Sequence, residues 1–195
     1  MRSLERILWT VAVIALSIYA LAWGERWLYQ RYLAWEFTDT LPAAKASHEM
    51  RTAGSTAFHR ALLNTKEQPL GRLEIPSIGL HSIFLEGVED RTLRRGIGHI
   101  PGTALPAGSG NTGLAAHRDT FFSRLGEVQP GDAISITTLE ASYRYVVESI
   151  QIVDPDEAVV LHDIGRPVLT LVTCYPFQLI GPAPKRYIVH ASLQD

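Results

Sequence analysis

The chain has 195 residues, of which 46% are hydrophobic, enough for one domain of ordinary size and an additional segment. Its formal net charge at neutral pH is −2, and the residues from Leu70 onward carry 10 basic against 14 acidic side chains, hence −4. Nucleic-acid-binding domains present a basic surface, so this charge distribution excludes a nucleic acid as the partner.

The first apolar segment runs from Ile7 to Trp23 and contains 17 residues without a charge. A helix that spans a membrane needs about 17 to 25 predominantly apolar residues. Arg2 and Arg6 precede the segment, which favours a cytoplasmic N-terminus. We therefore expect residues 1–24 to form a cytoplasmic tip and a single-pass anchor in the lipid bilayer of the cell membrane. The rest of the chain would then be extracytoplasmic.

The alternative for this segment is a cleaved signal peptide, because Ala20-Leu21-Ala22 has the spacing of small residues found at cleavage sites. The apolar segment is longer than the core of an ordinary signal peptide, so we favour the uncleaved anchor. Residues 25–69 are more polar, and we expect a helical or flexible stalk there. Its first helix should end at Leu41-Pro42, because proline disfavours helix at the residue before it.

From residue 70 to 195 the pattern changes to short strands separated by glycine- and proline-rich turns. Many short strands at regular spacing predict an all-β sandwich or barrel. We favour a closed barrel, because closure removes exposed strand edges. Short helices are expected at 91–95 and 121–125, and a turn at 156–161. The strands are expected at residues 72–75, 80–85, 112–116, 132–138, 142–153, 168–174 and 186–192.

Cys174 is the only cysteine, so no disulfide can form within the chain. It ends an apolar strand that should stop near Pro176, which cannot donate a backbone hydrogen bond. A lone cysteine in an exported protein is a small buried hydrophobic residue, one half of an intermolecular disulfide, or a reactive thiol. Only the thiolate is nucleophilic, and it is a minor form of an ordinary thiol at neutral pH. A nucleophilic Cys174 therefore needs a partner that holds a proton.

Two other predicted strands supply candidate partners. His117 follows the strand at 112–116, and a histidine can hold or accept a proton near neutral pH. Arg186 opens the last strand, and its guanidinium is permanently charged and can stabilise an oxyanion. Of the other histidines, His99 is expected to support a loop by hydrogen bonding.

The segment Thr170-Leu171-Val172-Thr173-Cys174 resembles the Thr-Leu-x-Thr-Cys signature of the sortases, which are membrane-anchored cysteine transpeptidases of bacterial surfaces. The histidine before it and the arginine about a dozen residues after it also match that family. The strings LTLVTCYPF, GPAPKRYIV and AHRDTFF are most similar to class D sortases. The resemblance covers about Gly71 to the C-terminus. It implies that residues 70–195 form a catalytic domain with a closed eight-stranded sortase-type β-barrel and short helices.

The resemblance also implies a reaction and its catalytic residues, Cys174, His117 and Arg186. Cys174 would attack a Leu-Pro-x-Thr-Gly/Ala-like sorting motif in a surface protein and form a thioacyl intermediate. An amine on a cell-wall precursor or a pilin-like lysine would then resolve this intermediate. His117 would act first as an acid and then as a base.

We expect the substrate to lie in a groove between the loop at 154–166 and the segment 175–184. Within that groove, Val159, Val160 and Leu161 are predicted to line a pocket for the leucine. Thr173 and Tyr175 are predicted as further substrate contacts.

No cofactor and no metal are predicted. Some class A sortases hold calcium with carboxylates in the loop before the histidine strand, and here Pro101 to Asn111 contains no Asp or Glu. Cys174, His117 and His99 could be considered for zinc, but the chain has no close-spaced pair of zinc ligands.

Three other functions remain open from the residues. A hydrolytic cysteine peptidase is possible, although papain-like enzymes place the cysteine before the histidine. A membrane-anchored β-barrel that binds an extracytoplasmic partner would have Cys174 buried and inert. A redox sensor would use Cys174 in an intermolecular disulfide.

Overall fold

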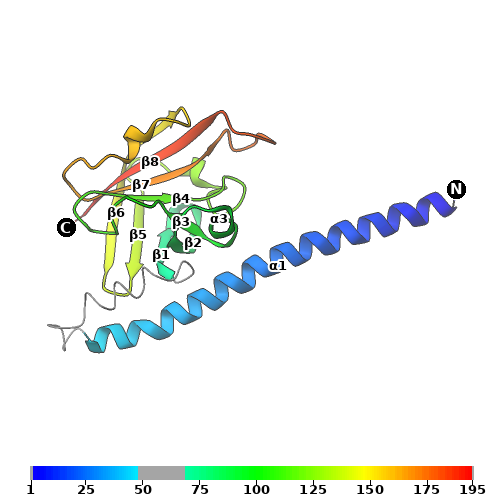
Figure 1. Ribbon diagram of the computed structural model, residues 1–195, viewed down its shortest axis with the longest axis horizontal. Coiled ribbons are helices and arrows are strands. Elements are labelled where there is room, and N and C mark those ends of the chain that lie inside the picture. Colours follow the sequence, from blue (N-terminus) through cyan, green and yellow to red (C-terminus); the bar gives the residue numbers. More distant parts are fainter. Residues whose placement is uncertain (1, 48–68, 195) are drawn as a thin grey trace.

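The computed structural model describes residues 2–47 and 69–194. Its strands close into a barrel in the order β1-β2-β3-β4-β7-β8-β6-β5 (Figure 1). The strands are β1 (Pro69–Ile75), β2 (Leu80–Glu86), β3 (Ile97–His99), β4 (Asn111–Ala115), β5 (Ala133–Thr138), β6 (Ser142–Val153), β7 (Val168–Tyr175) and β8 (Lys185–Leu193). The closed eight-stranded barrel expected from the sequence is confirmed.

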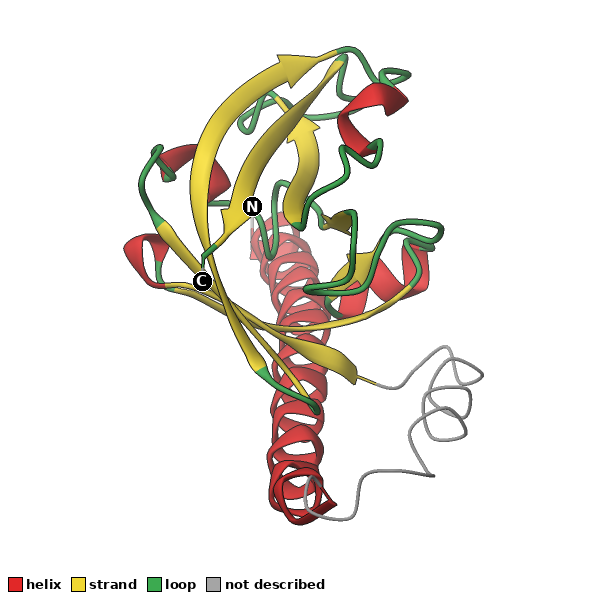
Figure 2. Cartoon of the chain, turned by 90° about the vertical axis from the view of Figure 1, so that its left-hand side faces the viewer, coloured by secondary structure: helices red, strands yellow, loops and turns green. Residues whose placement is uncertain are grey.

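The barrel closes because β1 pairs antiparallel with both β2 and β5. Two neighbouring pairs are parallel, β2 with β3 and β4 with β7, and the others are antiparallel. Figure 2 shows the strands curving around a common interior. β7 therefore lies between β4 on one side and β8 on the other, which brings three segments that are far apart in the sequence together.

Alternate residues of each strand fill the barrel, as the period of two in a strand requires. On β7, Leu169 and Leu171 belong to the core and are fully buried, whereas Val172 and Cys174 are partly exposed. On β8, Val189 and Ala191 point into the same core. The two faces of β7 thus differ, because one packs the interior and the other carries the partly exposed Val172 and Cys174.

Short helical segments connect the strands. α3 (Asp90–Arg95) ends where the backbone N–H of Gly96 donates to the carbonyl of Thr92, as expected for the helix at 91–95. The turn expected at 156–161 is the 3₁₀ helix η4 (Ala158–Leu161). Two further 3₁₀ helices are η2 (Pro76–Ile78) and η3 (Leu125–Glu127).

The helix expected at 121–125 is wrong. The chain there makes hydrogen-bonded turns, in which the N–H groups of Thr120 and Phe122 both donate to the carbonyl of His117. Phe122 and Leu125 are fully buried in the barrel core. Burial of both side chains directly after β4 favours these tight turns over a regular helix.

β3 is a strand that the residue pattern did not predict. It has only three residues, and its Gly98 lies against the backbone of Gly87, where an added Cβ would be 2.3 Å from the Gly87 carbonyl oxygen. Glycine is therefore required for this close backbone approach. A strand this short is below the length at which alternation can be recognised.

α1 (Arg2–Ser47) runs past one side of the barrel and extends beyond it (Figures 1 and 2). Gln30 joins the two, because its Oε1 accepts from the N–H of Ile83 at 3.1 Å and its Nε2 donates to the carbonyl of Arg95 at 2.6 Å. The expected helix end at Leu41-Pro42 is wrong, since the helix continues to Ser47. Pro42 removes only one backbone donor, and it does so near the end of the helix.

Among the helices that the structure describes, none is long and apolar enough to cross a membrane. The transmembrane anchor expected in residues 1–24 is therefore not confirmed and stays a prediction. Much of the expected stalk, residues 48–68, lies outside the described residues.

Candidate active site

Cys174 and Arg186 lie directly opposite each other on β7 and β8. Residues paired in this way on antiparallel strands have Cβ atoms roughly 5 Å apart and project from the same face. Both are on the outer face of the barrel and are partly exposed. The Nη1 of Arg186 donates to the backbone carbonyls of Lys185 at 3.1 Å and Ala183 at 3.5 Å. These bonds hold the guanidinium at the start of β8, beside the end of β7 that carries the thiol.

His117 reaches the same place from the other side of β7. β4 is parallel to β7 with Ala115 level with Val172. The next residue, Ala116, donates its N–H to the Val172 carbonyl at 3.3 Å and accepts from the Thr173 hydroxyl at 2.7 Å. The pairing of β4 with β7 therefore continues through Ala116, and the next residue, His117, lies beside Cys174. The three predicted catalytic residues are therefore contributed by β7, by β8 and by the segment directly after β4.

Thr173 and Tyr175 face the opposite way from Cys174. Thr173 is buried, and its hydroxyl fastens β7 to the segment before His117. Tyr175 packs in an aromatic cluster with Phe177 and Tyr187, with ring centroids 6.0 Å and 6.1 Å from its own. Burial raises the pKa of Tyr187, and the neighbouring Tyr175 adds to that rise. Thr173 and Tyr175 were both predicted as substrate contacts, but neither lines the groove on the outer face between η4, β7 and β8.

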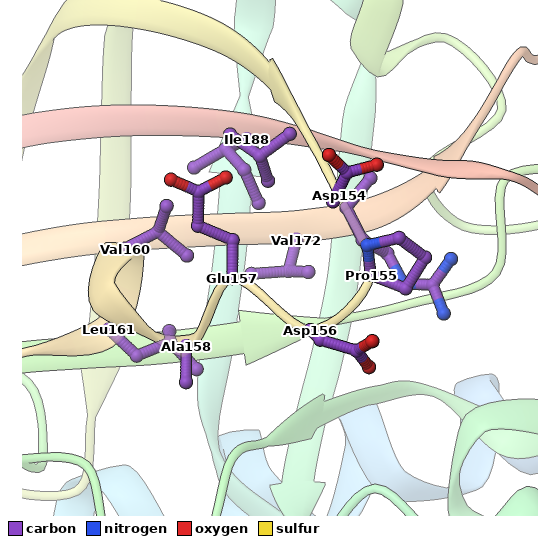
Figure 3. A pocket seen from close by; sticks show the side chains of 11 residues that line it. Asp154, Pro155, Asp156, Glu157, Ala158, Val160, Leu161, Val172 and Ile188 are labelled. Atoms are coloured by element: carbon purple, nitrogen blue, oxygen red, sulfur yellow. The ribbon is translucent and has the colours of Figure 1, made fainter.

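A groove of about 230 Å³ lies on the outer face of the barrel and extends to Arg186 (Figure 3). Val172 and Ile188, from β7 and β8, form its floor, and Ala158, Val160 and Leu161 of η4 form a wall. Arg186 is also in its lining, so the groove extends to the residue that faces Cys174. The complete lining is Val153, Asp154, Pro155, Asp156, Glu157, Ala158, Val160, Leu161, Val172, Arg186 and Ile188.

Of the three predicted pocket residues, Val160 and Leu161 line the groove and Val159 does not. Val159 is 65% exposed on the outer side of the turn. A 3₁₀ turn separates its successive side chains by about a third of a revolution, so three consecutive residues cannot all face the same wall. The sequence therefore identified the segment that lines the groove, but not the direction of each of its side chains.

The groove is apolar at its floor and acidic at its rim. Asp154, Asp156 and Glu157 lie on the loop that encloses it. Lys185 Nζ donates to Asp154 Oδ1 at 2.7 Å, which ties this loop to the start of β8. The site therefore offers a thiol, an imidazole and a guanidinium beside a cavity that fits an apolar side chain.

Arg118 was not predicted to have a role, yet it binds the loop between β7 and β8. Its Nη1 donates to the carbonyl of Pro176 at 3.0 Å, and its Nη2 donates to those of Leu179 at 2.7 Å and Gly181 at 2.6 Å. The loop that follows Cys174 is thus held by the residue that follows His117. The string AHRDTFF contains this arginine. Its role could not be predicted from the sequence, because any residue type can supply the backbone carbonyls that it binds.

His99 supports a loop, as expected. Its Nδ1 pairs with Glu86 Oε2 at 2.8 Å, and its Nε2 donates to the carbonyl of Ala104 at 3.0 Å. In the described residues, no group of three or more His, Cys, Asp or Glu side chains is arranged to hold a metal ion. The absence of a metal and of a cofactor in this protein remains a prediction.

Comparison with known proteins agrees with this geometry. The Sortase domain family model matches residues 73–194. This chain belongs to the sortase family. It is similar to Sortase D of Bacillus subtilis, with 36% identity over 124 residues that cover 63% of each protein. It is also similar to Sortase A of Bacillus anthracis, with 31% identity over 66% of this chain and 61% of the relative. The matched part of this sortase thus spans less than two thirds of those curated relatives.

Solved structures of sortases share the barrel. A Clostridium perfringens Sortase D5 transpeptidase is 27% identical with a TM-score of 0.65, and the alignment covers 82% of this chain and 98% of that one. A Clostridium perfringens sortase C, whose structure is described with the C-terminal cell wall sorting motif, is 30% identical with a TM-score of 0.63. That alignment covers 68% of this chain and 75% of the other. The resemblance to class D sortases noted in the sequence is confirmed by the similarity to Sortase D.

Replacing Arg118 by lysine should loosen the loop between β7 and β8 of this sortase. A single ammonium group cannot span three carbonyls as a forked guanidinium does. Hydrogen bonds to charged groups are the stronger ones, so we expect chymotrypsin to cleave at Phe177 or Leu179 about tenfold faster in Arg118→Lys. Arg94→Lys is the control, because Arg94 makes an exposed pair with Asp90 on α3. Equal cleavage rates in Arg118→Lys and the unmodified chain would show that Arg118 does not hold the loop.

Proposed function

We propose that this sortase is a cysteine transpeptidase in which Cys174, His117 and Arg186 are the catalytic residues. The observation that carries the proposal is the direct pairing of Cys174 with Arg186, beside an apolar groove and with His117 on the other side of β7. Membership of a family of transpeptidases supports the reaction type. Cys174 is partly exposed, which favours a reactive thiol over the inert core cysteine of a binding module.

The first half of the reaction breaks a peptide bond. The thiolate of Cys174 attacks the carbonyl carbon of the threonine in the sorting motif, and the carbonyl oxygen becomes an oxyanion. Arg186 donates hydrogen bonds to that oxyanion and lowers the barrier. His117, as an imidazolium, gives its proton to the departing amine. The products are a thioester on Cys174 and a free C-terminal fragment.

The second half forms a new amide bond. Neutral His117 accepts a proton from the incoming amine, and the amine attacks the thioester carbonyl. The tetrahedral intermediate then expels the Cys174 thiolate, and the imidazolium remains beside it. The resting charges of both residues are restored. We propose an amine of a cell-wall precursor or a pilin-like lysine as the acceptor.

The groove suits a Leu-Pro-x-Thr-Gly/Ala-like signal carried by surface proteins. Val160, Leu161, Val172 and Ile188 offer an apolar surface for the leucine. Arg186 lies at the end of this surface nearest to Cys174, where the threonine carbonyl has to be. The sorting motif described with the Clostridium perfringens sortase C supports this class of substrate.

We further propose that residues 1–24 anchor the enzyme in the cell membrane, with a cytoplasmic N-terminus and an extracytoplasmic barrel. The apolar side chains of α1 from Ile7 to Leu21 are exposed on all sides of the helix, so they need an apolar surrounding that the barrel does not provide. We expect the full-length chain to resist alkaline carbonate extraction from membranes. We also expect added protease to remove the barrel from intact protoplasts. Release by carbonate, or a barrel that is protected from the protease, would contradict the anchor.

Full-length protein incubated with a Leu-Pro-x-Thr-Gly peptide should gain the mass of the acyl fragment on Cys174. Addition of an amine such as triglycine should convert that adduct into a ligated peptide, whereas a hydrolytic peptidase would release only the free acid. Cys174→Ala should form neither product, with an unchanged melting temperature. Adduct or cleavage in Cys174→Ala would rule out Cys174 as the nucleophile.

Arg186→Lys should reduce kcat while changing KM little. Removal of an oxyanion donor typically costs about 100-fold or more in kcat, and the ammonium of lysine lacks the forked donors of arginine. Arg166→Lys is the matched control, since Arg166 pairs with Glu148 on the surface and does not line the groove. Equal kcat values for the two variants would mean that Arg186 does not act in the transition state.

A further inference from the structure

A chain of hydrogen bonds crosses the outer face of the barrel from β8 to the wall of the groove. His190 on β8 lies opposite Thr170 on β7, and its Nδ1 is 3.0 Å from the Thr170 hydroxyl. That hydroxyl is 2.7 Å from Oδ1 of Asn111 on β4. Nδ2 of Asn111 lies 3.0 Å from the carbonyl of Val160 and 3.4 Å from that of His162. Three strands are thus connected to η4.

The chemistry of the groups fixes the direction of every bond. Two carbonyl oxygens can only accept, so the atom of Asn111 that faces them is its NH₂ group, and its oxygen faces Thr170. An amide oxygen also only accepts, so the Thr170 hydroxyl donates its single proton to Asn111. His190 must then donate its Nδ1–H to the Thr170 oxygen. All donors therefore point toward the groove wall, and Asn111 uses its oxygen and both amide hydrogens.

η4 has few other connections to the barrel. None of its four residues is buried, and the residues from Asp154 to Val159 are exposed. Asn111, in contrast, is 4% exposed. The second contact is at Gly113, also on β4, where an added Cβ would be 3.1 Å from Cδ2 of Leu161. Val160 and Leu161 of the wall are thus held against β4 mainly by the buried side-chain amide of Asn111 and by the close packing of Leu161 on Gly113.

We propose that Asn111 is a positioning residue, which sets the distance between η4 and the floor of the groove and thereby selects a branched apolar residue in the substrate. This proposal rests on the proposed function, because it assigns the groove to the leucine of the sorting motif. Asn111 does not touch the reacting atoms. It acts through the Val160 carbonyl, and Thr170 and His190 keep its amide oriented.

The main test is Asn111→Asp in the full-length protein. The carboxylate has the same shape and still accepts from Thr170, but its second oxygen faces the carbonyls of Val160 and His162 and repels them. With a Leu-Pro-x-Thr-Gly peptide we expect KM to rise about tenfold, as for a buried hydrogen bond that is lost, and kcat to change less than about threefold. With Ala-Pro-x-Thr-Gly, the variant and the unmodified enzyme should have similar KM values. An equal rise in KM for both peptides, or a loss confined to kcat, would overturn the proposal.

Four further variants separate an effect on positioning from effects of charge and of folding. Gln151→Glu adds the same charge at a position paired with Ile188 of the groove floor but outside the hydrogen-bond chain, and its KM should not change. Thr170→Val keeps the shape of the side chain and removes the donor to Asn111, so it should raise KM for the leucine peptide selectively. His190→Asn can donate from Nδ2 in place of the histidine Nδ1 and should retain the original KM, whereas His190→Leu should not. Unchanged kinetics in Thr170→Val would refute the role of the chain.

Amide hydrogen exchange gives a result that does not depend on activity. The N–H of His162 donates to the carbonyl of Val159 within the turn. Its exchange should become about tenfold faster in Asn111→Asp and Thr170→Val, while the amides of β7 exchange as before. Unchanged exchange would show that Asn111 does not fix the wall, and would overturn the proposal. If no peptide yields an adduct with the unmodified enzyme, the proposed function fails, and this measurement still decides whether Asn111 holds η4.

Discussion

The position of β7 between β4 and β8 is the constraint on which the rest of this site depends. Parallel pairing on one side and antiparallel pairing on the other bring His117, Cys174 and Arg186 to one end of three adjacent strands. Backbone hydrogen bonds fix this register, and a shift of one residue would turn Cys174 into the core. The alternation that packs Leu171 and Thr173 inside therefore also decides that the thiol faces outward.

Both loops around the site are held by side chains in or directly after β4. Asn111 at its start binds the carbonyls of the loop between β6 and β7, and Arg118 after its end binds those of the loop between β7 and β8. β4 and the segment after it thus supply a proposed catalytic histidine and also the side chains that hold the two loops beside it. The loop between β6 and β7 has little buried surface, and its contacts to β4 are those to the buried Asn111 and of Leu161 with Gly113.

Alternation along the strands predicted a barrel, and the resemblance to sortases supplied its eight strands and the three proposed catalytic residues, which the structure brings close together. Cys174, His117 and Arg186 each occur in a recognisable segment, and the register then brings those segments together. The sequence was not sufficient for β3, which has three residues, or for the turns around Phe122, which depend on burial in the assembled core. The supporting roles of Asn111 and Arg118 were missed because their partners are backbone carbonyls, which every residue has.

Under the proposed function, binding through backbone carbonyls affects how the substrate range of this sortase can change. A side chain that binds a backbone carbonyl does not depend on which residue carries that carbonyl, so the hydrogen bond from Asn111 to η4 survives substitution of Val160. Under the proposed function, substitution of Val160 therefore changes the lining of the groove, and with it the preferred substrate, while the hydrogen bond to Asn111 and the three proposed catalytic residues are kept. The side chain of Val160 would then set the specificity, whereas its backbone carbonyl holds the wall of the groove in place.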